Sequence, residues 1–229
     1  MKELLISCMD HRLNGFIDQL SSAQTILVRN AGANIFSIKE SIKFLIDNNE
    51  ISKIILSTHN DCGAMKVVFN SIKNKKNPND DIYNKLVKQF EKRSFNTIEE
   101  LEKINTEIQL NELEKIAKGI KIEVKTIDLS NYKSNSNEEH KLVYSFPDAY
   151  NYEELSKKLG INENEIYFIH ANHFDEIKHD LDIAIDYLGI KDINFLATKA
   201  SDYREMNKEM NLAMLKSSIK NINLNFIKL

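Results

Sequence analysis

Short apolar runs alternate with amphipathic stretches over the first part of the chain. Apolar runs of strand length, rich in β-branched residues, cover Glu3 to Ser7, Thr25 to Val28 and Lys53 to Ser57. Between the second and third runs, apolar residues recur at helical spacing from Ser37 to Asn48. Alternating strands and helices predict an α/β fold with a parallel sheet flanked by helices. In such folds functional side chains lie where strands end at their carboxyl edge. Cys8, Arg29 and His59 occupy such positions.

The middle of the chain has a different pattern. Ala64 to about Lys118 is helical and highly charged, with a polar break around Pro78, and we interpret it as an insertion or arm. Ile120 to Leu129 then alternates apolar and polar residues as a strand does. The polar segment from Ser130 to Glu139 predicts a linker that divides the chain.

The sequence after this linker resembles the beginning of the chain. Leu142 to Asp148 matches Leu4 to Asp10 at an offset of 138 (142 − 4), and later strand-like and helix-like runs follow in the same order. This self-similarity predicts an internal tandem duplication, although any two β-α-β runs resemble each other to some degree. The predicted domains are a first half, residues 1–138, and a degenerate repeat packed against it, residues 139–229.

The second copy lacks the chemistry of the first. The positions of Cys8 and Arg12 are taken by Phe146 and Tyr150, and His59 falls opposite Lys199. We therefore predict a metal-free repeat that acts as a built-in partner, so that the chain forms a pseudo-dimer with itself. Further assembly into homo-oligomers is left open.

Composition excludes several classes of partner. The formal net charge of −3 on 229 residues gives no field that would attract nucleic acid or an anionic membrane. No run approaches the roughly 20 apolar residues of a membrane span, and the start of the chain has no signal-peptide pattern, so we expect a cytoplasmic protein. Its 2 cysteines allow at most one disulfide, which favours free thiols or metal ligands.

Both cysteines and one histidine stand at predicted strand ends. Cys8 follows the first strand, while His59 and Cys62 follow the third and are separated by three positions. Taken singly, a buried cysteine is usually a small core residue and a lone histidine is usually hydrogen-bonded. Together, two thiolates and an imidazole suit Zn²⁺ and leave one coordination position for water or substrate, which is typical of a catalytic site.

A carboxylate and a guanidinium follow the first cysteine at alternate positions. If the strand geometry persists, Cys8, Asp10 and Arg12 point the same way. Gly63, which follows Cys62, allows a close approach of the backbone.

These motifs resemble those of the β-carbonic anhydrases. Cys8-x-Asp10-x-Arg12 and His59-x-x-Cys62-Gly63 form that family's signature, and the resemblance covers roughly the first 75 residues. It implies zinc ligation by Cys8, His59 and Cys62. It also implies that Asp10 pairs with Arg12, and that this pair decides whether water or the Asp10 carboxylate takes the fourth position on the metal. Residues expected to line the substrate pocket or support the site are Gly63, Ala64 and the family's middle motif, Arg29, Asn30, Ala31 and Gly32.

The implied function is zinc-dependent, reversible hydration of carbon dioxide to bicarbonate by a metal-bound hydroxide. Asp10 and Arg12 are the catalytic candidates. Asp10 orients the hydroxide by accepting its hydrogen bond, and Arg12 acts as a gate that holds Asp10 off the metal by a bidentate ion pair.

Two other functions fit the same residues. One is hydrolysis of a sulfur analogue, carbonyl sulfide or carbon disulfide, on the same zinc site. The other is a non-catalytic zinc-binding protein, against which the Asp10–Arg12 pair argues.

Three weaker features accompany the main motifs. A second metal cluster around His170, His173 and His179 is disfavoured, because their spacings do not share one helix face. His11 is a candidate proton relay. The family often supplies a glutamine to the partner's pocket, but no glutamine of this chain lies in a matching motif.

Overall fold

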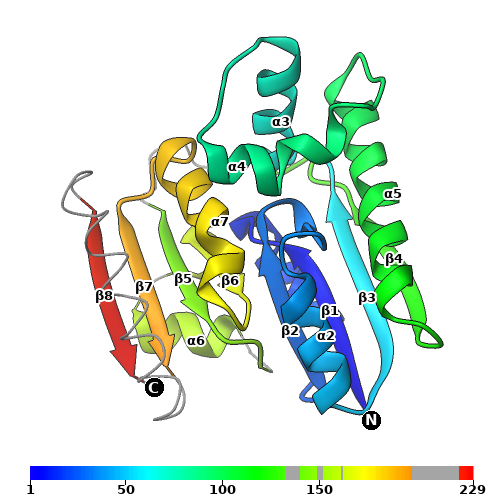
Figure 1. Ribbon diagram of the computed structural model, residues 1–229. Helices are drawn as coiled ribbons and strands as arrows, with labels where there is room; N and C mark the ends of the chain where they lie inside the picture. The colour runs from blue at the N-terminus through cyan, green and yellow to red at the C-terminus, as the bar shows by residue number, and fades with distance from the viewer. Residues whose placement is uncertain (133–139, 149–151, 161, 198–221, 229) are drawn as a thin grey trace.

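The described residues form an eight-stranded sheet with strand order β4-β3-β1-β2-β6-β5-β7-β8. The computed structural model describes residues 1–132, 140–148, 152–160, 162–197 and 222–228. Figure 1 shows the strands of the first half of the chain at one end of this sheet and those of the second half at the other end, with helices α2 and α7 in front of it.

The elements follow one another in the predicted alternation. The strands are β1 (Lys2–Cys8), β2 (Thr25–Asn30), β3 (Ile51–His59), β4 (Lys121–Ile127), β5 (Lys141–Ser145), β6 (Ile166–His170), β7 (Asp192–Ala197) and β8 (Asn223–Lys228). The α-helices are α1 (Asn14–Leu20), α2 (Lys39–Asn48), α3 (Gly63–Lys73), α4 (Asp80–Lys85), α5 (Ile98–Ile116), α6 (Tyr152–Leu159) and α7 (Phe174–Asp186). Short 3-10 helices are η1 (His11–Leu13), η2 (Ala31–Ala33), η3 (Val87–Phe90) and η4 (Glu163–Glu165).

The sheet is parallel within each half and antiparallel where the halves meet. β1 pairs in parallel with β2 and β3, and β5 pairs in parallel with β6 and β7. β2 and β6 run antiparallel, with Arg29 opposite His170. The predicted α/β fold is thus confirmed, but the sheet is mixed rather than wholly parallel. Local patterns could not show this, because the junction joins strands far apart in the sequence.

The central strands are buried on both faces, as their continuous apolar runs predict. Leu4, Leu5 and Ile6 of β1 are fully buried, and Ile54 and Leu56 of β3 are buried with them. This core fixes the register of the strands, since a slip of one residue would move every side chain to the opposite face. It therefore fixes where the strand ends, and the side chains they carry, come together.

The charged segment from Ala64 to Lys118, interpreted from the sequence as an insertion or arm, packs closely against the rest of the first half. Its long helix α5 packs against α3 and β3. α5 buries Glu102, Asn105 and Gln109, which all hydrogen-bond to backbone or side chains near the end of the central strands. A charge-rich sequence hides this role, because only one narrow face of the helix carries buried polar groups.

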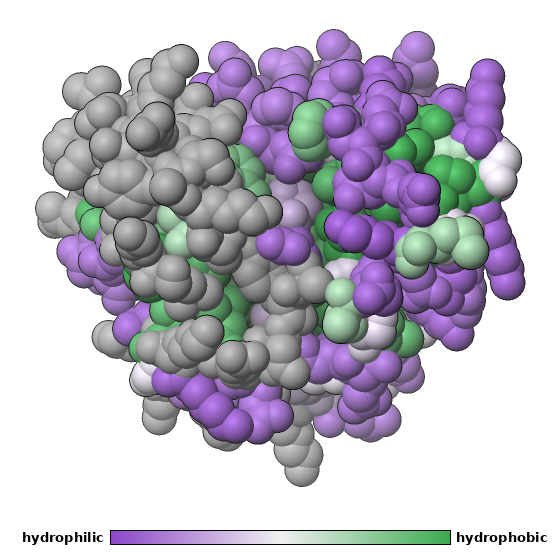
Figure 2. All heavy atoms as spheres, turned by 90° about the horizontal axis from the view of Figure 1, so that it is seen from below, coloured by the Kyte–Doolittle hydropathy of each residue, from purple (hydrophilic) through white to green (hydrophobic). Residues whose placement is uncertain are grey.

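The remaining surface is largely polar. Figure 2 shows mainly hydrophilic residues over the described part of the face seen from below, with hydrophobic patches between them. Among the described residues, no helix has the length and apolar character needed to cross a membrane. Most of the predicted linker, and Tyr150 and Lys199 of the second copy, lie outside the described residues.

Candidate metal centre

Cys8, His59 and Cys62 come together at the carboxyl edge of the sheet. β1 and β3 are parallel neighbours, so Cys8 at the end of β1 and His59 at the end of β3 reach the same edge. Cys62 follows just before α3. All three are buried, and one ligand atom of each lies within 4.8 Å of the others. The sequence prediction that these residues converge is therefore met by the geometry.

The donor set fits a zinc ion. His59 donates from Nδ1 to the carbonyl oxygen of Asn60 at 2.8 Å, which leaves Nε2 as the lone-pair nitrogen. This buried Nε2 has no hydrogen-bond partner among the described residues. The hydrogen bond from the Cys62 thiol lowers the pKa of Cys8 well below its ordinary value, despite burial, while the same bond and burial raise the pKa of Cys62. An anionic sulfur beside an unpartnered imidazole nitrogen is the arrangement that a cation stabilises.

Asp10 and Arg12 form the predicted ion pair, although by a different local geometry. The strand ends at Cys8, and the Asp10 side chain caps the 3-10 helix η1 by accepting the backbone N–H of Arg12 at 3.0 Å. The Arg12 guanidinium then reaches back, with Nε 3.0 Å from Oδ1 and Nη2 2.7 Å from Oδ2 of Asp10. Burial raises the pKa of Asp10, but the hydrogen bonds and charge of Arg12 outweigh it and lower that pKa to about 2. Asp10 is thus an anion at neutral pH.

Arg29 does not line the pocket; it holds the backbone that carries the site residues. Its side chain is fully buried and donates to the carbonyl oxygens of Cys8, at 2.9 Å, and Asp10, at 2.8 Å. Its guanidinium also lies over the rings of Tyr152 and Phe168, at 5.2 and 5.9 Å from their centroids. A buried cation with this many partners fixes the backbone that carries the ligand and the carboxylate.

The rest of the middle motif shapes the turn beside Cys8. Asn30 donates to the carbonyl oxygen of Asn34 and to Ser37. The Gly32 backbone N–H points at the Cys8 sulfur, 3.3 Å away. Gly32 has φ +75°, and a Cβ there would lie 3.3 Å from Ala64, so a larger residue would be both strained and crowded.

A small pocket opens beside the three ligands. Its volume is about 20 Å³, close to the space that one or two water molecules need. It is lined by Cys8, Met9, Asp10, Ala31, Gly63, Ala64, Tyr167, Ile183 and Leu188. The last three belong to the second half of the chain, and sequence patterns gave no sign of their place in the wall.

The profile described as carbonic anhydrase matches residues 3–143, which is more than half of the chain. This chain belongs to the β-carbonic anhydrase family. The match spans the strands that carry all three candidate ligands and ends inside β5.

Solved structures of carbonic anhydrases resemble part of the chain. The β-carbonic anhydrase CafA of Aspergillus fumigatus is 16% identical, with a TM-score of 0.45, over 57% of this chain and 72% of that one. The β-carbonic anhydrase isoform I of Trichomonas vaginalis is 20% identical, with a TM-score of 0.40, over 57% and 79%. A carbonic anhydrase from Glaciozyma antarctica is 17% identical, with a TM-score of 0.35, over 56% and 77%. No curated protein matches the chain.

The family's pocket glutamine has no counterpart among the residues lining this pocket. Gln109 accepts from the backbone of Ile35 and donates to Asn105, and Gln89 donates to Asn34 and to the carbonyl oxygen of Lys85. Both are used to hold the loop before α2. Besides Asp10, Tyr167 is the lining residue whose side chain carries an oxygen.

Two polar contacts around the ligands escaped the sequence prediction. Glu102 of α5 accepts the backbone N–H of Cys62, the residue just before α3, at 2.8 Å. Asp61, between the ligands His59 and Cys62, binds Arg12 with its carboxylate at 2.5 Å and its carbonyl oxygen at 2.8 Å. Glu102 lies 40 residues from Cys62 and Arg12 lies 49 residues from Asp61, so local spacing carried no signal.

The other histidines form no second metal cluster among the described residues. His170 contacts Ser145 at 2.6 Å and Tyr152 at 3.1 Å, inside the junction of the halves. His11 contacts the carbonyl oxygen of Asn164, and burial together with the charge of His140 lowers its pKa to about 4. An imidazole whose pKa lies this far below neutral pH is a poor proton relay there, because proton transfer is most efficient when the pKa is near the working pH.

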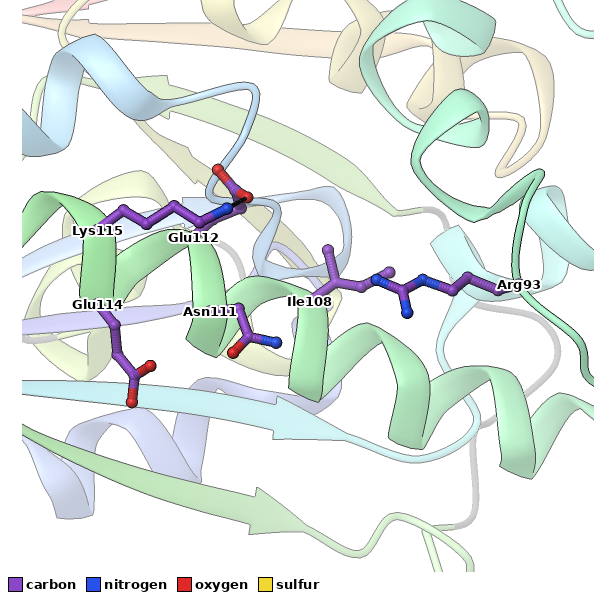
Figure 3. Close-up of a pocket in the computed structure, with 6 residues that line it drawn as sticks. All are labelled: Arg93, Ile108, Asn111, Glu112, Glu114 and Lys115. Carbon is purple, nitrogen blue, oxygen red and sulfur yellow. Dashed lines mark hydrogen bonds and ion pairs between the residues drawn. The ribbon is translucent and has the colours of Figure 1, made fainter.

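A larger hollow, of about 440 Å³, lies along one side of α5. Figure 3 shows its lining residues, Arg93, Ile108, Asn111, Glu112, Glu114 and Lys115, with Lys115 and Glu112 paired. It has no thiol or imidazole, and its charges are mixed. The smaller pocket beside Cys8 therefore remains the candidate site.

Proposed function

We propose that this chain is a zinc-dependent carbonic anhydrase that interconverts carbon dioxide and bicarbonate. The observation that carries the proposal is that Cys8, His59 and Cys62 converge beside a small pocket containing the Asp10 carboxylate. Membership of the β-carbonic anhydrase family supports it. A purely structural zinc site would be closed by a fourth protein ligand. Among the described residues the candidate group has three members, and a pocket lined by Cys8 and Asp10 lies beside it.

The residues around the pocket have distinct roles in this proposal. Bound zinc supplies Lewis-acid chemistry that makes water a nucleophile near neutral pH. Asp10, anionic and oriented by two bonds from Arg12, would accept a hydrogen bond from that nucleophile and so orient it. Arg12 keeps the carboxylate in this role because its ion pair with Asp10 competes with zinc for the carboxylate oxygens. The Gly32 N–H, 3.3 Å from the Cys8 sulfur, stabilises that sulfur as a thiolate.

Pocket size and polarity suit a small apolar substrate. A volume of about 20 Å³ admits a molecule of a few atoms and excludes larger ones. Ile183, Leu188 and Ala64 give apolar walls that favour an uncharged gas, while Asp10 and Tyr167 add the polar edge that an oxygen-bearing product needs.

We also propose that the two halves arose by tandem duplication, with domains at residues 1–138 and 139–229. The strand order β2-β1-β3-β4 of the first half recurs as β6-β5-β7-β8 in the second. The pairing recurs as well: Leu4 faces Ile26 and Ile54, and Leu142 faces Tyr167 and Ile193, at offsets of 138, 141 and 139 (142 − 4, 167 − 26, 193 − 54). Two unrelated β-α-β units can readily share a strand order, but a shared pairing register between their strands is less expected.

In this proposal the second half is a built-in partner that completes the pocket. Tyr167, Ile183 and Leu188 form one of its walls. α7 also holds the first half through buried carboxylates, because Glu176 accepts the backbone N–H groups of Glu40 and Ser41 at 3.0 Å. Asp180 accepts the backbone N–H of Ala31 at 2.8 Å, next to the glycine that faces Cys8.

The proposed activity is tested with Asp10→Asn and Arg12→Ala, measuring zinc content separately from hydration. We expect both variants to keep zinc and to lose hydration activity by roughly 10²-fold or more, as for removal of a positioned acid–base group. Full activity with zinc retained would refute the roles of the pair. Zinc-loaded wild-type protein without any hydration activity would favour the non-catalytic alternative, and faster turnover of carbonyl sulfide on the same preparation would favour the hydrolase.

The role of the second half is tested with a fragment. We expect residues 1–138 alone to be poorly soluble or poorly active, because one wall of the pocket and the caps from α7 are missing. A stable, fully active fragment would contradict the built-in partner.

A further inference from the structure

Asp61 stands between two candidate ligands in an unusual backbone conformation. It follows β3 and precedes α3, with His59 two residues before it and Cys62 directly after it. Its φ is +55°, in the left-handed region that few residues other than glycine adopt, and aspartate and asparagine are the commonest exceptions. This turn aims both the side chain and the carbonyl oxygen of Asp61 at the loop that follows β1.

The Arg12 guanidinium is shared between Asp10 and Asp61. Nε and Nη2 bind the two oxygens of Asp10, at 3.0 and 2.7 Å. Nη1 binds Oδ2 of Asp61 at 2.5 Å, and Nη2 also binds the Asp61 carbonyl oxygen at 2.8 Å. Four of the five N–H donors of Arg12 are thereby assigned, and the planar group has no freedom to turn away from Asp10 while both Asp61 contacts hold.

Burial rises from Asp61 towards the metal centre. The side chain of Asp61 is 44% exposed, that of Arg12 is 14% and that of Asp10 is 8%. At the outer end, Lys66 of α3 binds the other carboxylate oxygen of Asp61 at 2.5 Å. Glu102 is a further charged group near Asp61. Exposed pairs such as Lys66–Asp61 contribute little by themselves, so the Asp61–Arg12 contact is the one with consequences for the site.

We propose that Asp61 is a positioning residue for the Asp10–Arg12 gate. It anchors the far side of the Arg12 guanidinium, so that the near side stays in its bidentate pair with Asp10. This rests on the proposed function, in which that pair keeps the Asp10 carboxylate from becoming a fourth zinc ligand. The loop between His59 and Cys62 then both supplies ligands and locks the residue that controls the fourth position.

Asp61→Asn is the variant that isolates this contact. Asparagine tolerates the positive φ, keeps the carbonyl contact to Arg12 and preserves side-chain shape, whereas alanine would add backbone strain. The charge-assisted bond becomes a neutral one, which is about half as strong. Asp47→Asn, an exposed position on α2, makes the same chemical change away from the site and serves as control.

The readout is the visible spectrum of the full-length protein loaded with Co²⁺ in place of zinc, which responds to the set of ligands on the metal. Arg12→Ala provides the reference spectrum for a released Asp10, and Asp10→Asn provides one without the carboxylate. We expect Asp61→Asn to bind a full equivalent of Co²⁺, with a spectrum shifted from wild type towards that of Arg12→Ala. Its hydration activity with zinc at neutral pH should fall by about threefold to tenfold, as expected when a partly exposed charged bond is weakened.

A double variant separates this role from a general structural one. If Asp61 acts only through Arg12, adding Asp61→Asn to Arg12→Ala changes neither the spectrum nor the activity further, while independent effects would add. A wild-type spectrum for Asp61→Asn, loss of bound Co²⁺, or additive effects would each overturn the proposal. If Arg12→Ala itself retains the wild-type spectrum and activity, the gate in the proposed function fails instead, and the two failures are distinct.

Discussion

Replacing Gly63 with alanine separates the stability of the fold from the use of the pocket. Gly63 is the first residue of α3 and lines the pocket beside Cys8. A Cβ at this position would lie 3.7 Å from a methyl carbon of Leu188, which is an ordinary van der Waals contact, and its φ is not in the left-handed region. The folded chain can therefore accept the substitution without moving its backbone.

The expected effects on stability and on activity have opposite signs. Loss of glycine's freedom in the unfolded chain stabilises a compatible site by about 0.4–1 kcal/mol, or about 1–4 °C in Tm for a protein of this size. The new methyl group, however, projects into a pocket of about 20 Å³, hardly more than the roughly 10–15 Å³ that one water needs. We expect kcat/KM for hydration to fall by roughly tenfold to a hundredfold, because the substrate is displaced or misoriented.

The measurement pairs thermal unfolding with stopped-flow hydration at equal zinc content. Gly15→Ala is the matched control, since Gly15 also lies in the first turn of a helix and a Cβ there would meet nothing within 4 Å. It should gain a similar stability and keep full activity. Undiminished activity of Gly63→Ala would show that substrate does not use this pocket, and lost zinc would show that the methyl group disturbs the ligands instead.

Further predictions concern pH, buried caps and the metal. Burial lowers the pKa of His179 to about 3 from 6.5, so its neutral form stabilises the fold fully above pH 6.5 and this stability is lost as pH falls towards 3. At pH 5 the loss is about 2 kcal/mol, at about 1.36 kcal/mol per pH unit. The free energy of unfolding of His179→Leu, measured with denaturant, should therefore fall less between pH 7 and pH 5 than that of wild type. An equal fall in the two proteins would refute this prediction. Buried Asp180, whose pKa is raised, is present in both proteins. Glu176→Ala removes the acceptor for two N–H groups at the start of α2, and we expect denaturant unfolding to show a loss of about 1–3 kcal/mol; no loss would mean that water replaces the carboxylate. Chelation of zinc should lower Tm by about 5–10 °C if the ion was present at a hundred times its Kd, and an unchanged Tm in a scanning experiment would argue against a bound metal.

The convergence of the ligands was predictable because it follows from one topological rule. Parallel strands present their carboxyl ends at the same edge, and Cys8 and His59 end neighbouring strands whose apolar runs are plain in the sequence. The pairing of Asp10 with Arg12 was also predicted, but for an incomplete reason. The chain leaves the strand after Cys8, and the two side chains meet because Asp10 caps a tight turn that contains Arg12.

What the sequence could not show depends on contacts between distant segments. The pocket wall from Tyr167, Ile183 and Leu188 needs the antiparallel meeting of β2 with β6, and no local pattern specifies that junction. Glu102 looks like one more charge on a polar helix until α5 is packed against α3. The second contact of Arg12, with Asp61, depends on a left-handed backbone turn that aspartate adopts only in certain settings.

The antiparallel junction of β2 and β6 has a consequence for how the protein behaves at low concentration. A pocket wall contributed by a separate subunit is lost when the protein is diluted below the dissociation constant of the pair, whereas a wall on the same polypeptide faces its counterpart at a high effective concentration. In the proposed enzyme, turnover per chain would be the same at nanomolar and micromolar protein. A cell could then use very few copies without losing any of them to disassembly.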